Sequence, residues 1–143
     1  MKKRKEGVRK GFTMVELMAV LIILGLLATL VTTKVFKQIE NARVATTKAN
    51  LKTLHTAVMQ FKMDTLRFPT DEEGLEILVE SIGDIEGYDL DGYLEQTEIP
   101  KDGWKNEFIY EAFPESGKQF AIRSCGPDGE EGTEDDLLST DAD

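Results

Sequence analysis

The chain has 143 residues, which suits one small domain, and a formal net charge of −10 at pH 7. The first ten residues carry a net charge of +5, so the remainder carries −15. An acidic body repels phosphates, which argues against a nucleic-acid partner, and the single cysteine, Cys125, excludes an intrachain disulfide.

An apolar run at 12–31 follows the basic start and contains one charged residue, Glu16. As a helix it would be about 30 Å long, one hydrocarbon thickness, and the basic residues before it favour a cytoplasmic N-terminus. A cleaved secretory signal is disfavoured because Ala28-Thr29-Leu30 lacks the usual A-x-A ending. An acid in a membrane span is costly, so Glu16 is a candidate functional residue that needs a cationic partner.

The start of this run carries a resemblance to a known family. Residues 10–17, KGFTMVEL, resemble the processing signature of type IV pilins and pseudopilins. The resemblance implies that prepilin peptidase cuts after Gly11 and methylates the new N-terminal residue, Phe12. It also implies that Glu16 pairs with the N-terminal amine of a neighbouring subunit when the filament assembles.

The same resemblance implies three parts of the chain. These are a leader at 1–11, a membrane-spanning and filament-core helix at 12–36, and a periplasmic globular domain at 37–143. The protein is then expected in the inner membrane with a single pass and a cytoplasmic N-terminus. The family's usual proline is replaced by Thr33, so the helix need not kink there.

The remaining sequence predicts a small α+β domain. Apolar residues at helical spacing continue the first helix to about Asp64, and His55 in this helix is expected to be a surface or packing residue. Thr70 and Glu73 have the spacing of a capping box, which predicts a short second helix. Trp104 is expected in the core. The other expected elements are a loop at 81–100 and two strands at 108–110 and 120–122, joined by a turn at 114–117.

Two segments narrow the resemblance to the major pseudopilin of type II secretion systems. Residues 67–75, RFPTDEEGL, are similar to its Y-P-T-x-x-Q-G-L segment. Residues 100–108, PKDGWKNEF, are similar to its P-x-D-P-W-G-N-P-Y segment, with Gly103 and Lys105 as departures. The implied fold is α+β and pilin-like, with a long N-terminal helix packed on a small antiparallel sheet and a C-terminal calcium loop. The implied partners are further copies of the chain, prepilin peptidase, minor pseudopilins and the inner-membrane assembly platform.

The tail between 125 and 136 is rich in glycine and crowded with acids. Like charges held close together repel, and Ca²⁺, which takes about 6–8 oxygen ligands, would relieve that repulsion. The EF-hand spacing is absent, so the residues alone leave a solvated acidic tail equally open. The family resemblance implies a calcium site formed by Asp128, Asp135, Asp136 and the backbone carbonyl of Cys125.

Three alternatives to a pseudopilin are open at this stage. The first is a type IV pilin or minor pilin for adhesion, motility or DNA uptake, although many such pilins close their C-terminal region with a disulfide. The second is a membrane-tethered calcium-binding or sensor domain that never polymerises, which leaves Gly11 and Glu16 unexplained. The third is a hydrolase with paired carboxylates. The sequence lacks a Ser/His/Asp set, a phosphate loop and zinc spacing, so we expect no catalytic activity.

Overall fold

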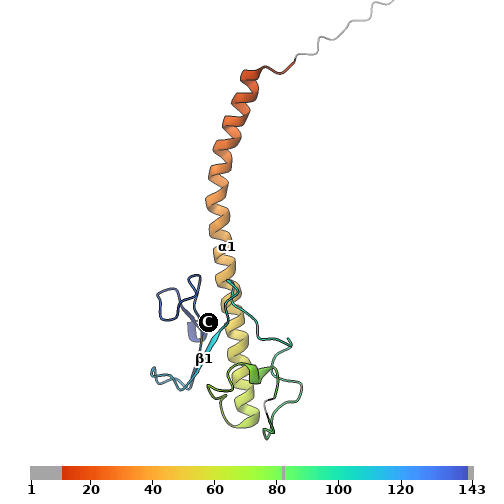
Figure 1. The fold of residues 1–143 in the computed structure, drawn as a ribbon, viewed down its shortest axis with the longest axis vertical. Helices are drawn as coiled ribbons and strands as arrows, with labels where there is room; N and C mark the ends of the chain where they lie inside the picture. Colours follow the sequence, from red (N-terminus) through yellow and green to blue (C-terminus); the bar gives the residue numbers. More distant parts are fainter. Residues whose placement is uncertain (1–10, 82, 142–143) are drawn as a thin grey trace, which may run out of the picture. The chain divides into compact units, whose positions relative to one another are not determined.

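The computed structural model describes residues 11–81 and 83–141 (Figure 1). Its elements, in chain order, are helix α1 (Met14–Thr65), the 3-10 helix η1 (Glu76–Leu78), strands β1 (Ile109–Ala112), β2 (Phe120–Ser124) and β3 (Leu137–Leu138), and the 3-10 helix η2 (Ser139–Asp141). The chain divides into two compact units, one that ends at Ile39 and one that runs Glu40–Asp143, and α1 contributes to both. The prediction of an α+β fold with a long N-terminal helix and an antiparallel sheet is confirmed.

In the first unit, α1 exposes apolar side chains all around the helix. Leu21 is 64% exposed and Leu24 is 56% exposed. Among the described residues, α1 is the one helix long and apolar enough to cross a membrane, judged by length and composition. Its most apolar window has a mean hydropathy of 2.6 and no buried residue. A helix that is apolar on all sides suits a lipid or protein surrounding rather than water. The helix continues past Thr33, as expected where proline is missing.

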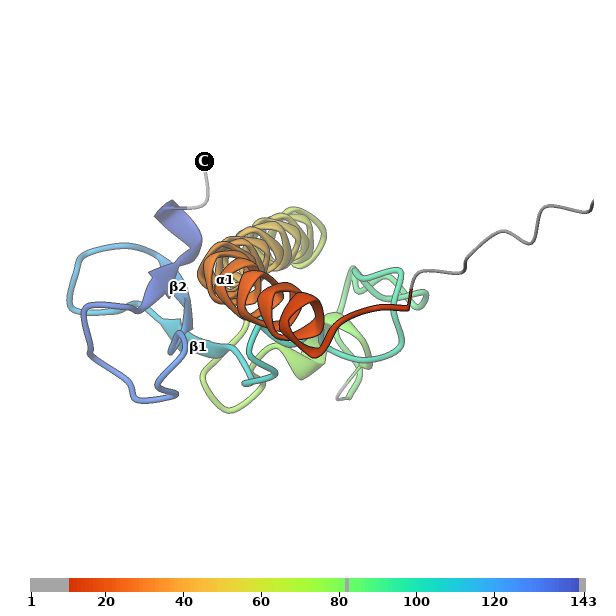
Figure 2. The same cartoon turned by 90° about the horizontal axis from the view of Figure 1, so that it is seen from above.

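The second unit packs its core around the part of α1 that follows Glu40. In Figures 1 and 2 the sheet and the 84–100 segment lie on different sides of this part of the helix. The core consists of Leu51, Leu54, Ala57, Val58, Phe61, Leu75, Ile77, Leu78, Phe108, Phe120 and Ile122. The helical members recur every three or four residues, so they share one face of α1, as the spacing predicted.

The sheet has the order β1-β2-β3, and both strand pairs are antiparallel. Its first hairpin is the predicted one, and the amide of Gly117 closes the turn by donating to the carbonyl of Pro114 at 3.0 Å. Along β2, Phe120, Ile122 and Ser124 are buried, while Arg123 points to the other face. Strand β3 was not predicted, and it pairs with β2 through Ser124 and Leu137.

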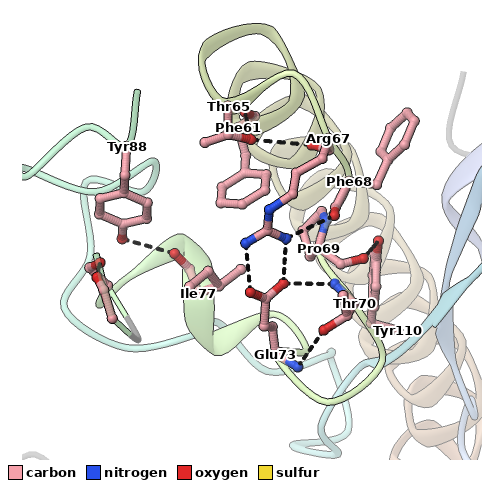
Figure 3. Close-up of polar contacts among 12 residues, drawn as sticks. Phe61, Thr65, Arg67, Phe68, Pro69, Thr70, Glu73, Ile77, Tyr88 and Tyr110 are labelled. Atoms are coloured by element: carbon pink, nitrogen blue, oxygen red, sulfur yellow. Dashed lines mark hydrogen bonds and ion pairs between the residues drawn. The ribbon is translucent and has the colours of Figure 1, made fainter. Parts of the chain in front are cut away.

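The capping box at Thr70 forms, and the short helix predicted after it is a 3-10 helix. The amide of Thr70 donates to Glu73 Oε2 at 2.8 Å, and the amide of Glu73 donates to Thr70 Oγ1 at 3.3 Å (Figure 3). Gly74 then adopts a φ of +57°, a left-handed conformation that ends the helical path. The 3-10 helix η1 follows Gly74, so the predicted short helix forms, but as three residues of 3-10 helix that start beyond the capping box.

An ion pair fixes the chain just after α1. Arg67 donates to both carboxylate oxygens of Glu73 at 2.7 Å, and its guanidinium lies 5.3 Å from the ring centroid of Phe61 (Figure 3). Hydrogen bonding from Arg67 lowers the pKa of Glu73 from 4.5 to about 2. Close by, the hydroxyl of Tyr110 donates to the carbonyl of Pro69 at 2.9 Å, which joins this turn to β1.

Two aromatic predictions had different outcomes. His55 packs against the ring of Phe120, with centroids 4.8 Å apart, so its expected packing role is confirmed. Trp104 is only half-buried, contrary to the expected core position. Its indole N–H donates to Glu40 Oε1 at 3.1 Å, and this need for a polar partner keeps one edge of the ring near the surface.

Candidate functional site

The expected processing point lies immediately before α1. Gly11 and Phe12 are non-helical and exposed, and the side chain of Phe12 is 83% exposed. Among the described residues, nothing lies within 4 Å of where a Cβ on Gly11 would stand. The Gly11–Phe12 peptide bond is therefore open to a peptidase, while most of the expected leader, residues 1–10, lies outside the described residues.

Glu16 lies in the first turn of α1 and has a partner in its own chain. The amide of Thr13 donates to Glu16 Oε2 at 3.4 Å, and the amide of Glu16 donates to Thr13 Oγ1 at 3.3 Å. This is a capping box at the positive end of the helix dipole, where a carboxylate is stabilised. Sequence reasoning missed the role of Thr13, although its T-x-x-E spacing matches that used to predict the box at Thr70.

The acidic tail at 125–136 forms the loop that joins β2 to β3, which we call the acidic loop. Each of the three predicted aspartates in it accepts a hydrogen bond. Asp128 Oδ1 accepts from the amide of Glu130 at 2.9 Å. Asp136 Oδ2 accepts from the amide of Gly132 at 2.9 Å. Asp135 Oδ1 accepts from the hydroxyl of Thr133 at 2.7 Å, and this bond holds the pKa of Asp135 below its ordinary value. The loop is thus ordered by its own side chains.

Two of the predicted calcium ligands, Asp135 and Asp136, share a hydrogen-bond donor in this loop. Thr133 Oγ1 lies 2.7 Å from Asp135 Oδ1 and 3.4 Å from Asp136 Oδ1, so one hydroxyl lies between the two adjacent carboxylates. Hydrogen bonding from Asp128 also contributes to the lowered pKa of Asp135. At Gly126, which follows Cys125, a Cβ would stand 3.1 Å from Asp135 Oδ2, so the backbone closely approaches that carboxylate.

The donor set fits calcium by its chemistry. All proposed ligands are oxygens, which hard divalent cations prefer. Within residues 11–81 and 83–141, however, no three His, Cys, Asp or Glu side chains are grouped so that they could hold a metal ion. The aspartates are directed at donors of their own chain instead. The thiol of Cys125 is buried, and burial raises its pKa, so it stays protonated and suits a structural role.

Arg123 is a functional candidate that sequence reasoning missed. Its guanidinium lies 2.8 Å from Glu131 Oε1 and 3.8 Å from Asp136 Oδ2, and its side chain is 24% exposed. It places one positive charge against the acidic loop. Its position two residues before Cys125 gave no signal in the sequence, because the contact depends on which face of β2 the side chain occupies.

Comparison with known proteins gives two family matches that together span most of the chain. Residues 34–140 match the family described as type II secretion system (T2SS), protein G, and residues 8–32 match the prokaryotic N-terminal methylation motif. The chain belongs to the type II secretion system protein G family. The match to this family confirms the predicted resemblance to the type II secretion pseudopilins.

Individual members of the protein G family are similar over nearly their whole length. The type II secretion system core protein G of Pseudomonas aeruginosa is 36% identical over 138 residues, which cover 94% of this chain and 93% of the relative. The core protein G of Escherichia coli K12 is 35% identical over 134 residues, which cover 92% and 90%. The crystal structure of the major pseudopilin from the type 2 secretion system of enterohaemorrhagic Escherichia coli matches with a TM-score of 0.61 and 27% identity. The matched region covers 72% of this chain and 90% of the pseudopilin chain in that crystal structure.

These matches assign the chain to the pseudopilins of type II secretion and give it a pilin-like fold. The protein G family is one of structural subunits and not of known enzymes, which disfavours the hydrolase alternative. The methylation motif implies processing by a prepilin peptidase and assembly with other secretion components. The apolar N-terminal helix with this motif fits a pseudopilus anchored in the inner membrane.

Proposed function

We propose that this chain is the precursor of a major pseudopilin that polymerises into a periplasmic pseudopilus and drives protein secretion across the outer membrane. Prepilin peptidase removes residues 1–11 and methylates Phe12, and residues 12–36 anchor the chain in the inner membrane with 37–143 in the periplasm. Minor pseudopilins and the inner-membrane assembly platform are its further partners. The observation that carries the proposal is the exposed Gly11–Phe12 bond one residue before the Thr13–Glu16 capping box, in a chain of the protein G family.

The Thr13–Glu16 geometry supports a specific role for the carboxylate of Glu16. In the single subunit its charge is balanced by the amide of Thr13 and the helix N-terminus. Cleavage after Gly11 creates a positive amine on Phe12 of each subunit. The amine of a neighbouring subunit then offers Glu16 a full positive charge, which attracts the carboxylate more strongly than the partial charges of a backbone amide and a helix end.

The test of this role is Glu16→Gln in the full chain, expressed in a host that has prepilin peptidase and the assembly platform. Glutamine still accepts the hydrogen bond from Thr13, so α1 keeps its cap, while the negative charge is lost. We expect membrane insertion and a processed mass of residues 12–143 plus one methyl group, but few filaments by electron microscopy. Glu40→Gln, with the same charge change outside the anchor, is the control. Normal filament yield from Glu16→Gln would contradict the proposal.

We also propose that the acidic loop binds Ca²⁺ through Asp128, Asp135, Asp136 and the carbonyl of Cys125. The ion would neutralise carboxylates that crowd one short loop, which otherwise repel one another. The support is the all-oxygen donor set, the shared Thr133 hydroxyl and the approach of Gly126 to Asp135.

The test is a thermal melt of the processed chain in detergent, with calcium, with the same concentration of magnesium, and with chelator. A ligand that binds only the folded state raises stability by about 2.7 kcal/mol at a hundredfold excess over its dissociation constant. We expect calcium to raise the Tm, magnesium to raise it less, and Asp135→Ala to abolish the rise. No effect of calcium at millimolar concentration would exclude the metal site and leave the filament proposal standing.

A further inference from the structure

Asp102 is a nearly buried acid that lies outside the acidic loop, with a relative exposure of 5%. Its Oδ1 accepts from the amides of Trp104 at 2.9 Å and Asn106 at 2.7 Å. Its Oδ2 accepts from the hydroxyl of Ser124 at 2.7 Å. Both oxygens are therefore held by donors, and charge-assisted bonds of this kind fix the carboxylate in one orientation.

Two hydrogen-bonded paths lead from Asp102 to Gly126, where the acidic loop begins. On the first path, Ser124 donates to Asp102, and its Oγ accepts from the amide of Gly126 at 3.2 Å. On the second path, Asp102 holds the amide of Asn106, whose Nδ2 donates to the carbonyl of Gly126 at 3.0 Å. Both backbone polar groups of Gly126 are thus bound by residues that Asp102 holds.

Gly126 in turn is tightly placed against the acidic loop. Its φ is +63°, and a Cβ there would stand 2.5 Å from the carbonyl oxygen of Asp135 and 3.1 Å from its Oδ2. Cys125 directly precedes Gly126, and Asp128 follows it by two residues. A displacement of Gly126 would therefore shift the carbonyl of Cys125 and the carboxylate of Asp128 relative to Asp135.

We propose that Asp102 is a positioning residue for the acidic loop and sets its affinity for calcium. The inference rests on the proposed calcium site and adds to it a residue that holds the loop without binding the ion. Asp102 acts through Ser124, Asn106 and Gly126. Removal of a group that orients metal ligands typically lowers metal affinity about 10–100-fold.

The experiment is a calorimetric calcium titration of the full processed chain in detergent, at a temperature well below the Tm. We expect Asp102→Asn to raise the calcium dissociation constant about 10–100-fold. Ser124→Ala removes the acceptor for the amide of Gly126 without changing the net charge, so it tests the same path if Asp102→Asn does not fold. It is expected to weaken binding in the same direction.

Asp71→Asn is the matched control. Asp71 also accepts a backbone hydrogen bond, from the amide of Ala112 at 2.6 Å, but this bond joins the segment before η1 to β1 instead of holding Gly126. The control changes the net charge by the same amount as Asp102→Asn. We expect its calcium affinity to equal that of the unmodified chain.

The outcomes separate this inference from the proposed calcium site. If the unmodified chain binds calcium and both Asp102→Asn and Ser124→Ala bind it equally well, Asp102 has a structural role only and the inference is overturned, while the calcium site stands. If Asp71→Asn loses as much affinity as Asp102→Asn, the effect is one of net charge, and the inference is also overturned. If the unmodified chain binds no calcium, the proposed site and the inference both fall.

Discussion

The pair formed by Arg67 and Glu73 predicts a specific loss of stability in acid. The pKa of Glu73 is lowered from 4.5 to about 2 in the folded chain. A group whose pKa is lowered by folding stabilises the fold above its unfolded pKa, and this contribution is lost as the pH falls from about 5 to about 2. The shift corresponds to about 3 kcal/mol in the absence of screening. Since the side chain of Arg67 is 39% exposed, solvent reduces the contribution to about 1–2 kcal/mol.

The perturbation is Glu73→Gln, which keeps an acceptor for the amide of Thr70 but removes the charge. Chemical unfolding at pH 7, 5 and 3 is followed by fluorescence of Trp104, the single tryptophan of the chain. At pH 7 we expect the variant to be less stable than the unmodified chain by about 1–2 kcal/mol. The difference should be nearly the same at pH 5, fall by roughly half at pH 3 and approach zero only as the pH nears the folded pKa of about 2. Other carboxylates titrate equally in both proteins, so the difference isolates Glu73. A difference that stays constant across this range would refute the reasoning.

Two further substitutions test the backbone around Trp104. Lys105 has a φ of +75°, where a side chain costs about 1–2 kcal/mol and glycine costs nothing sterically, so Lys105→Gly should stabilise the fold by about 0.5–1 kcal/mol after the added chain entropy of glycine. An unchanged or lowered unfolding midpoint would contradict this. A Cβ on Gly103 would overlap the backbone carbonyl of Arg43, so Gly103→Ala should destabilise the domain by about 1–3 kcal/mol in the same unfolding assay. Stability equal to that of the unmodified chain would show that the loop moves aside freely.

The elements that the sequence predicted well are those with a repeated local pattern. The apolar run and the helical spacing up to Phe61 predicted α1, and the two clusters around Tyr110 and Ile122 predicted the hairpin. Strand β3 has only two residues in an acidic tail, too few for any alternation to be recognised. The turn after Thr70 shows the limit of a local rule, because the capping box formed while Gly74 ended the helix.

The candidate site was predictable only in part. The resemblance at residues 10–17 indicated Gly11 and Glu16, and the acids of the tail were visible in the sequence. The network around Asp102 was not predictable, since Asp102 and Ser124 are 22 positions apart and meet only in the folded chain. Gly103, one of the two departures from the family segment, shows the same dependence on distant contacts. The amide of Gly103, which a proline would lack, donates to Thr47 Oγ1 on α1 at 2.8 Å.

The pairing of Ser124 with Leu137 determines how the loop between them responds to changes in length. The strand pair brings the two ends of this loop together. The pairing of β2 with β3 therefore offsets the entropy lost on closing the loop, and no ligand within the loop is needed for this. For a flexible loop that entropy grows only with the logarithm of length, about 0.6 kcal/mol for each doubling. Residues inserted between β2 and β3, away from the three aspartates, should therefore cost the domain little stability. The connection can vary in length while the sheet that closes it stays the same.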